Sequence, residues 1–165
     1  MRTLVGTHGR TVRAYVARRI AAPEVDDVVA EVFVIAWRKA ATVPGDDGAR
    51  GYLLAIARRT LANHRRGLGR RLRLQRRAEQ VFEPRVANED TDQTRVLDAM
   101  RALRPEDREI LRLAAWEDLS NAEIAVVLAC TPATAAVRLS RARARLRNQL
   151  QDHPDIRTPR AVRHT

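Results

Sequence analysis

Apolar residues recur three or four positions apart along most of the 165-residue chain. That spacing places them on one side of an α-helix, whereas a half-buried strand would alternate apolar and polar residues, a pattern this chain lacks. Aromatic residues, which favour strands, make up only 4% of the chain. Hydrophobic residues make up 45%, enough for a packed core. The sequence therefore predicts an all-α protein.

The charge changes sign in the middle of the chain. Residues 58–77 contain nine arginines and no acid, whereas residues 79–92 contain five acids and one arginine. Gly67, Gly69 and Pro84, which are residue types typical of chain breaks, lie around this change. We therefore predict two small helical domains joined by a flexible linker. In chain order, the predicted parts are a first domain at 1–66, a linker at 67–91, a second domain at 92–150 and a disordered tail at 151–165. The expected helices of the first domain lie near 11–20, 22–39 and 51–66.

Two helix-start signals follow each other closely in the second half of the chain. In "SNAE", Ser120 and Glu123 form a capping box, in which each side chain satisfies a backbone amide of the other residue. A few residues later, Thr131 followed by Pro132 is typical of a second helix start. The three residues "ACT" between the two helices allow only a tight turn. This arrangement predicts a helix-turn-helix.

The helix that begins after Thr131 has two different faces. One face carries a stripe that must pack against the preceding helices, namely Ala135, Leu139, Ala142, Leu146 and Leu150. The opposite face carries Thr134, Val137, Arg138, Arg141 and Arg145. Such a face fits the DNA major groove, where arginine can hold phosphates or read guanine. A solvated surface helix would explain the arginines, but not the two helix-start signals before them.

The net charge of +11 favours an anionic partner. Only Lys39 is a lysine, so nearly all of the positive charge is arginine, whose planar fork of donors suits phosphates and guanine edges. Nucleic acid is the partner that this composition favours. A GC-rich genome would also produce a chain rich in arginine and alanine, so composition alone leaves this alternative open.

Several other kinds of protein are disfavoured. Cys130 is the single cysteine, which excludes an internal disulfide, and the four histidines lack metal-ligand spacing. No nucleophile–base pair and no phosphate-cradling glycine loop is found, so we predict no catalytic residues, no metal and no cofactor. No apolar run approaches the ~20 residues of a membrane span, and the N-terminus lacks the apolar core of a signal peptide. We expect a cytoplasmic protein without a membrane span.

The region around the predicted helix-turn-helix resembles a known family. Leu103-x-Pro105 and Glu109-x-Leu111 precede "LSNAEIAVVL", and a short turn leads to the arginine-bearing helix. This pattern resembles domain four of the extracytoplasmic-function sigma factors, promoter-recognition subunits of bacterial RNA polymerase. The resemblance implies that this helix reads the promoter −35 element. The implied contact residues are Thr131, Thr134, Val137, Arg138, Arg141 and Arg145.

The first half of the chain resembles domain two of the same family. The matching segments are "DDVVAEVFVIAWRKA" and "YLLAIARRTLANHRR". The first segment implies a surface for the clamp helices of the polymerase's largest subunit, formed by Asp27, Glu31, Val34, Ile35 and Arg38. The second implies a −10 reading surface, formed by Tyr52, Arg59, Asn63 and Arg66. Helical wheels agree, because they place core stripes opposite both sets: Val25, Val28, Val29, Val32, Phe33 and Ala36 in the first, and Leu53, Leu54, Ala57 and Leu61 in the second.

We expect Trp37 to close the core of the first domain rather than to stack on a base. The chain departs from the family pattern in three places. The family's tryptophan, asparagine and aspartate in the third helix are replaced by Tyr52, Arg59 and Asn63, so its −10 preference cannot be carried over. Ala129 replaces the turn glycine, which alanine tolerates if the turn avoids positive φ. Ala136 and Val137 replace a basic and a hydroxyl residue, which leaves the −35 sequence open. The loop 41–50 either captures a flipped base, as in the family, or is an ordinary acidic loop.

Three functions are compared. A sigma factor would bind core polymerase through its clamp helices and flap, would bind promoter DNA, and by resemblance could have an anti-sigma partner. A stand-alone helix-turn-helix regulator would bind DNA without polymerase. A polybasic nucleoid or membrane-surface protein would bind any polyanion. Only the first explains the acidic and apolar face around Asp27 and Glu31.

Overall fold

The computed structural model describes residues 2–75 and 91–152, and within them it contains α-helices and short 3-10 turns but no strand. The helices are α1 (Arg2–Ala17), α2 (Val25–Arg38), α3 (Asp46–Gln75), α4 (Thr91–Ala102), α5 (Pro105–Ala115), α6 (Asn121–Leu128) and α7 (Pro132–Asp152). The 3-10 turns are Ala22–Glu24 and Ala40–Thr42. The all-α prediction is confirmed. The predicted tail beyond residue 152 and residues 76–90 of the predicted linker lie outside the described residues.

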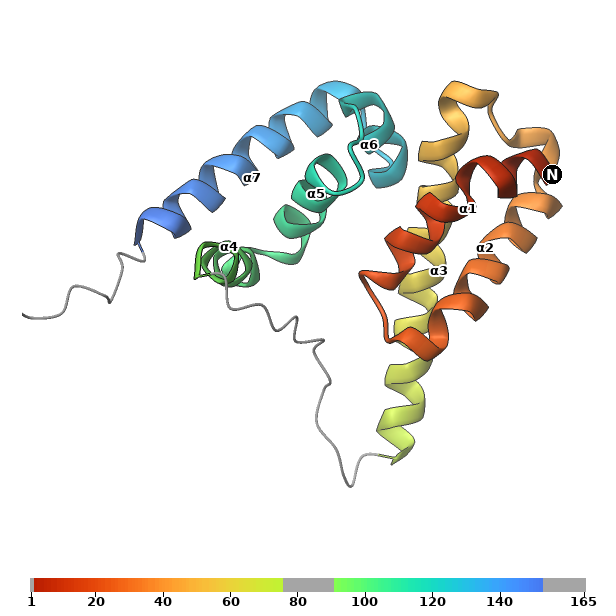
Figure 1. Ribbon diagram of the computed structural model, residues 1–165, viewed down its shortest axis with the longest axis horizontal. Coiled ribbons are helices and arrows are strands. Elements are labelled where there is room, and N and C mark those ends of the chain that lie inside the picture. Colours follow the sequence, from red (N-terminus) through yellow and green to blue (C-terminus); the bar gives the residue numbers. More distant parts are fainter. Residues whose placement is uncertain (1, 76–90, 153–165) are drawn as a thin grey trace, which may run out of the picture.

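Helices α1, α2 and α3 pack together as the first unit (Figure 1). Their buried stripes are the predicted ones. On α2, Val25, Val28, Val32 and Ala36 are buried and Val29 and Phe33 are half-buried; on α3, Leu53, Leu54, Ala57 and Leu61 are buried. Tyr15 and Val16 of α1 complete this core with no exposed surface. Because burying one large apolar side chain contributes about 1.5–3 kcal/mol, these stripes decide which face of each helix remains for function.

Helices α1 and α3 differ from the predictions at both ends. Helix α1 covers Arg2–Ala17 rather than 11–20. Helix α3 covers Asp46–Gln75 rather than 51–66, so it begins inside the predicted loop 41–50 and continues nine residues into the predicted linker at 67–91. The predicted break relied on Gly67 and Gly69. Glycine weakens a helix interior by about 1 kcal/mol but does not end it, and the leucines and arginines around these glycines are good helix formers.

Helices α4 to α7 form the second unit, in which α7 packs against α4, α5 and α6. Both predicted helix starts are present. The Ser120 hydroxyl accepts a hydrogen bond from the Glu123 amide at 3.3 Å, and a Glu123 carboxylate oxygen accepts one from the Ser120 amide at 2.9 Å. The Thr131 hydroxyl accepts a bond from the Thr134 amide at 3.2 Å. These caps satisfy amides that a helix leaves without partners in its first turn, so α6 and α7 start where the sequence predicts.

Trp37 does not close the core of the first unit. Its side chain is 65% exposed, in the last turn of α2. The buried positions Val28, Val32 and Ala36 follow one line of the helix, whereas Trp37 lies one turn beyond Val34 on the outer side. The prediction was therefore wrong, and an exposed tryptophan joins the outer face of α2.

The two units pack directly against each other. Helix α3 of the first unit lies along α6 of the second, and buried apolar side chains from both units form one continuous cluster (Figure 1). Gly51 of α3 is buried in this contact, where an added Cβ would lie 3.5 Å from the Glu123 Cα. The missing side chain therefore lets the two helices approach closely.

Candidate nucleic-acid interfaces

The exposed face of α7 is set by the stripe opposite it. Ala135, Leu139 and Ala142 are buried against α4, α5 and α6. Val137 is consequently 50% exposed, and Arg138 is exposed beside it. Arg141, one turn further along, is exposed too, and neither arginine forms an ion pair or hydrogen bond within the described part of the chain. Two forked cations thus flank an apolar contact, an arrangement that can hold phosphates and read base edges.

Thr131 and Thr134 lie at the start of this face. Besides the cap, their hydroxyl oxygens are 2.9 Å apart and share a hydrogen bond. Thr131 is exposed and Thr134 is half-buried. Hydroxyls at a helix N-terminus are well placed to donate to a phosphate, and the helix dipole favours that negative charge.

Arg145, which was grouped with this face, is paired with a carboxylate of the second unit, while its side chain remains 49% exposed. Its Nη1 donates to both carboxylate oxygens of Asp107, at 2.7 and 2.8 Å. Asp107 lies in the first turn of α5 and is only 8% exposed, so its charge needs a neighbouring cation. Arg145 therefore joins α7 to α5, and the assignment of Arg145 to DNA is withdrawn.

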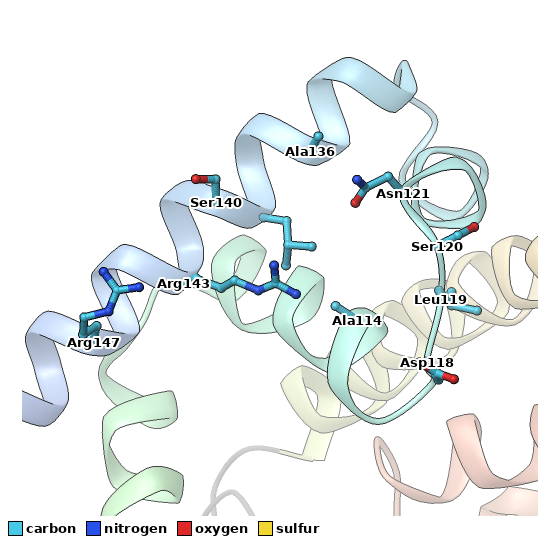
Figure 2. A pocket seen from close by; sticks show the side chains of 10 residues that line it. Ala114, Asp118, Leu119, Ser120, Asn121, Ala136, Ser140, Arg143 and Arg147 are labelled. Carbon is cyan, nitrogen blue, oxygen red and sulfur yellow. The ribbon is translucent and has the colours of Figure 1, made fainter.

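Beside the predicted face, the sequence reasoning missed a second basic flank of α7. Arg143 and Arg147 line a cavity of about 470 Å³ together with Ser140 of α7 and Asn121 at the start of α6. Figure 2 shows Arg143 directed from α7 toward Ala114, with Arg147 one turn further along. Their spacing of four residues places them on one side of the helix, and this was the signal that could have found them.

The turn between α6 and α7 has a backbone that favours glycine. Ala129 has φ 52° and ψ 53°, in the left-handed region. The condition that would have suited an alanine here, a turn without positive φ, is therefore not met. An L-residue in this conformation costs about 1–2 kcal/mol, so the tight turn carries strain.

On α3, three of the four predicted −10 residues lie together. Arg59, Asn63 and Arg66 line a cleft of about 720 Å³ between α3 and α5, and Arg66 donates a hydrogen bond to the Asn63 side chain at 2.6 Å. Tyr52 is half-buried and lies apart from this cleft. Its hydroxyl is 3.1 Å from that of Thr42, so it fastens the 3-10 turn at Ala40–Thr42 to α3.

The cleft between α3 and α5 is strongly basic. Its cations are Arg19, Lys39, Arg58, Arg59, Arg65, Arg66, Arg108 and Arg112, and its acids are Glu106 and Glu109. Burial, and next the neighbouring Arg19 cation, lowers the pKa of Arg112. Unbalanced positive charge of this kind attracts a polyanion.

The outer face of α2 carries the predicted polymerase-binding set, with one exception. Asp27, Glu31, Val34 and Arg38 are exposed and follow one line of the helix. Val34 is 42% exposed, and Trp37 extends the face at its C-terminal end. Ile35, by contrast, is half-buried against the core, so it supports the helix rather than the outer face.

In the described ranges, no group of three or more histidine, cysteine, aspartate or glutamate side chains is placed to hold a metal ion. No single described helix is long and apolar enough to cross a membrane, and α6 and α7 reach that length only as a pair bent by 98°.

Comparison with known families gives two matches that follow the two units. The model for Sigma-70 region 2 matches residues 4–71, and the model for Sigma-70 region 4 matches residues 93–146. The RNA polymerase sigma-E factor of Streptomyces antibioticus is 34% identical over 101 residues, which are 59% of this chain. That alignment covers 56% of the relative, little more than half of its length.

Solved structures with the same arrangement of helices include two protein complexes. The sigma factor RpoE of Bartonella quintana, solved with the anti-sigma factor NepR, has a TM-score of 0.66 at 20% identity and matches 93% of this chain and 98% of its own. CnrH, solved with the cytosolic domain of CnrY, has a TM-score of 0.62 at 27% identity and matches 92% of this chain and 88% of its own. Both likenesses cover both units.

Proposed function

This chain belongs to the sigma-70 family, and on that basis we propose that it is an extracytoplasmic-function sigma factor that directs core RNA polymerase to promoters. Region 2 corresponds to the unit of α1 to α3, and region 4 to the unit of α4 to α7. The proposed activity is binding rather than catalysis, and its place is the cytoplasm, where core polymerase acts.

The observation that carries the proposal is the exposed face of α7. One side of α7 is buried through Ala135, Leu139 and Ala142. The other side presents Arg138 and Arg141, which have no partner in the described structure. A short turn joins α6 to α7, so α7 takes the place of the second helix of a helix-turn-helix. We assign Thr131, Thr134, Val137, Arg138 and Arg141 to the −35 element, with Arg143 and Arg147 as neighbouring phosphate contacts.

The −10 element is assigned to the cleft side of α3. Arg59 and Arg66 are exposed cations, and Asn63 offers an amide for base or phosphate contacts. Tyr52 is proposed to act from its place on α3 beside the turn at Ala40–Thr42, where its hydroxyl is 3.1 Å from that of Thr42. Family membership supports this assignment; the sequence of the element follows from neither the fold nor the contacts.

The polymerase contact is assigned to the outer face of α2. Asp27 and Glu31 stand four residues apart with like charge, which is unfavourable in an isolated helix and is relieved by a basic partner. Val34 and Trp37 add exposed apolar surface, and tryptophan is among the residues that contribute most to protein interfaces. We propose Asp27, Glu31, Val34, Trp37 and Arg38 as the surface for the clamp helices, and region 4 as the partner of the flap.

A protein partner that holds the factor inactive is also proposed. RpoE was solved with the anti-sigma factor NepR, and CnrH with the cytosolic domain of CnrY. Since the fold of this chain matches both over more than nine-tenths of its length, a partner of the same kind fits.

Run-off transcription tests the proposed function. Purified bacterial core polymerase is incubated with fragments of the source genome, with and without this protein, and new transcripts are mapped. We expect discrete start sites only in its presence. The Asp27→Lys/Glu31→Lys variant should lose core binding, whereas Asp98→Lys/Glu106→Lys, which reverses two surface acids of the second unit, should retain it. Tight DNA binding without core binding or initiation would support the stand-alone regulator instead.

A further inference from the structure

The cleft between α3 and α5 contains arginines that the proposed DNA and polymerase contacts do not use. Arg58 and Arg65 come from α3, and Arg108 and Arg112 come from α5. All four line the same cleft of about 720 Å³. We call these four residues the cleft cluster. Cations from two helices, far apart in the sequence, therefore meet around one space.

No carboxylate of the described residues pairs with the cleft cluster. Arg65 donates to the Arg19 carbonyl at 3.2 Å, and Arg108 donates to three backbone carbonyls around the end of α4. Arg58 makes neither a hydrogen bond nor an ion pair within the described ranges. Glu109, an acid of the same cleft, is already paired with Arg19. Carbonyls orient a guanidinium but do not cancel its charge, so the positive charges of the cluster remain.

Arg112 shows that this arrangement is electrostatically unfavourable without an anion. Burial and the neighbouring Arg19 cation lower the pKa of Arg112, Glu109 offsets part of this effect, and two other arginines of the cleft cluster lower the pKa further. Its Nε is buried without a hydrogen-bond partner, and its guanidinium carbon lies 5.3 Å from the centre of the Trp116 ring. Because a nearby negative charge favours the charged form of an arginine, an anion in the cleft would stabilise Arg112.

The size and lining of the cleft suit a small molecule. Small-molecule sites span about 300–1,000 Å³, and they combine apolar lining with a few charged groups. The volume of this cleft lies within that range. Its apolar lining residues are Ile35, Ile56, Leu61 and Pro105. The cleft therefore offers charged positions for an anion and apolar surface beside them.

A chain of phosphates matches the cleft cluster better than a single phosphate does. The planar fork of each guanidinium fits two phosphate oxygens. One phosphate group carries at most about two negative charges at neutral pH, too few to balance four arginines. Linked phosphates carry more charge and can reach the arginines of both helices at once.

We infer that the cleft cluster is a binding site for a small polyphosphate, either an inorganic chain or the phosphates of a nucleoside triphosphate. The shared chemistry is the phosphate chain, held by Arg58 and Arg65 of α3 and by Arg108 and Arg112 of α5. The inference goes beyond the proposed function, because binding requires neither polymerase nor a promoter.

Titration calorimetry of the full chain tests the inference. The probes are inorganic tripolyphosphate, ATP, AMP and citrate, in magnesium-free buffer at about 0.1 M salt, where charges still interact over about 10 Å. Tripolyphosphate and ATP should bind at one site per chain, about 10-fold or more tightly than AMP or citrate. Equal affinity for tripolyphosphate and ATP would assign the site to the phosphates alone, and tighter binding of ATP would add a contact of the nucleoside with the apolar lining. Equal affinity for citrate, or many equivalent sites per chain, would overturn the inference.

Substitutions in the cleft cluster locate the site. Arg58 is exposed and unpaired in the described structure, so Arg58→Gln should fold as the wild type does and bind tripolyphosphate about 3-fold more weakly. Arg58→Gln/Arg112→Gln should lose about 10-fold or more. Arg10→Gln is the matched control, since it removes the same charge from an exposed position of α1 outside the cleft. Circular dichroism checks folding, and Arg58→Gln alone decides if the double variant is unfolded. Equal losses in Arg58→Gln and Arg10→Gln would show attraction to the net charge only and would overturn the site.

Nucleic acid is the other polyanion that this cleft could hold, and the same variants distinguish it. A single-stranded oligonucleotide is titrated in place of tripolyphosphate. If the double variant loses oligonucleotide binding while the wild type does not bind tripolyphosphate, the cleft cluster belongs to the DNA surface and the inference fails. These measurements use the free chain, so a failure of run-off transcription would count against the proposed function and leave the polyphosphate site standing.

Discussion

The two units are joined by ion pairs of Arg18 and Arg19 with Glu109 and Glu117, and of Arg50 with Glu123, which we call the inter-unit seam. This seam and the outer face of α7 are both rich in arginine, but the arginines have opposite roles. In the seam, Arg18, Arg19 and Arg50 are all held by carboxylates of the other unit. On α7, Arg138 and Arg141 have no such partner in the described structure. An arginine can therefore be assigned to DNA only when the described fold gives it no carboxylate partner.

Removing the buried arginine of the seam should have the largest effect on stability. Arg19→Met leaves Glu109 without its arginine and Glu117 with Arg18 alone, and breaking a buried pair costs about 3–5 kcal/mol. Urea unfolding should show this loss, together with an expanded shape. Arg13→Met, on the helix that precedes Arg19, is the control: its partner Asp26 is 74% exposed, so less than about 1 kcal/mol is expected. Equal losses in the two variants would mean that the seam contributes no more than a surface pair.

Substitutions on α7 should affect binding instead of stability. Arg138→Ala and Arg141→Ala should each weaken promoter binding by about 1–3 kcal/mol, or roughly 5- to 150-fold, because each removes a base or phosphate contact. Fluorescence anisotropy at fixed salt measures the affinity. Arg145→Ala should show the reverse pattern, with lower stability and nearly unchanged affinity, since it leaves the buried Asp107 unpaired. If Arg145→Ala weakens DNA binding as strongly as Arg138→Ala, Arg145 belongs to the −35 surface after all.

The same contrast explains how far the sequence could be interpreted. The caps at Ser120 and Thr131 and the buried stripes depend on neighbours within four residues, and they were predicted. Arg145 finds Asp107 at a separation of 38 residues, and Arg19 finds Glu109 at 90. Such partners are set by the packing of helices, and one sequence does not reveal them. The prediction for Trp37 was wrong for a related reason, because the burial of this side chain depends on which helices pack beside α2.

Acid should weaken the seam at Glu123. The Arg50 hydrogen bond, more than any other cause, lowers the pKa of Glu123 from 4.5 to about 2. A depressed carboxyl pKa contributes stability above the unfolded value and loses it as pH falls through the folded one. The difference in unfolding free energy between wild type and Glu123→Gln should therefore be full above pH 5 and shrink between about pH 4.5 and 2. A difference that stays constant over this interval would show that the Glu123 charge is not what Arg50 holds.

The smallest predicted effect lies in the turn between α6 and α7. Ala129→Gly removes the strain of a left-handed alanine, which costs the folded state about 1–2 kcal/mol. Glycine also increases the entropy of the unfolded chain, which offsets about 0.4–1 kcal/mol of this gain. The net expectation is about 0.5–1 kcal/mol of stabilisation in urea unfolding. Asp118, at φ 48°, is the comparison: aspartate tolerates this region better, so Asp118→Gly should gain less.

Ala129→Gly changes no ion pair of the seam and no arginine of α7, so its radius of gyration and promoter affinity should stay at the wild-type values. Asp118→Gly removes a carboxylate whose charge acts on Arg50, so it is compared for stability only. A change of affinity in Ala129→Gly alone would mean that the strained turn sets the angle at which α7 meets DNA. The seam and the α7 face would then be coupled through α6, whose first turn carries Glu123 and whose last residue precedes Ala129.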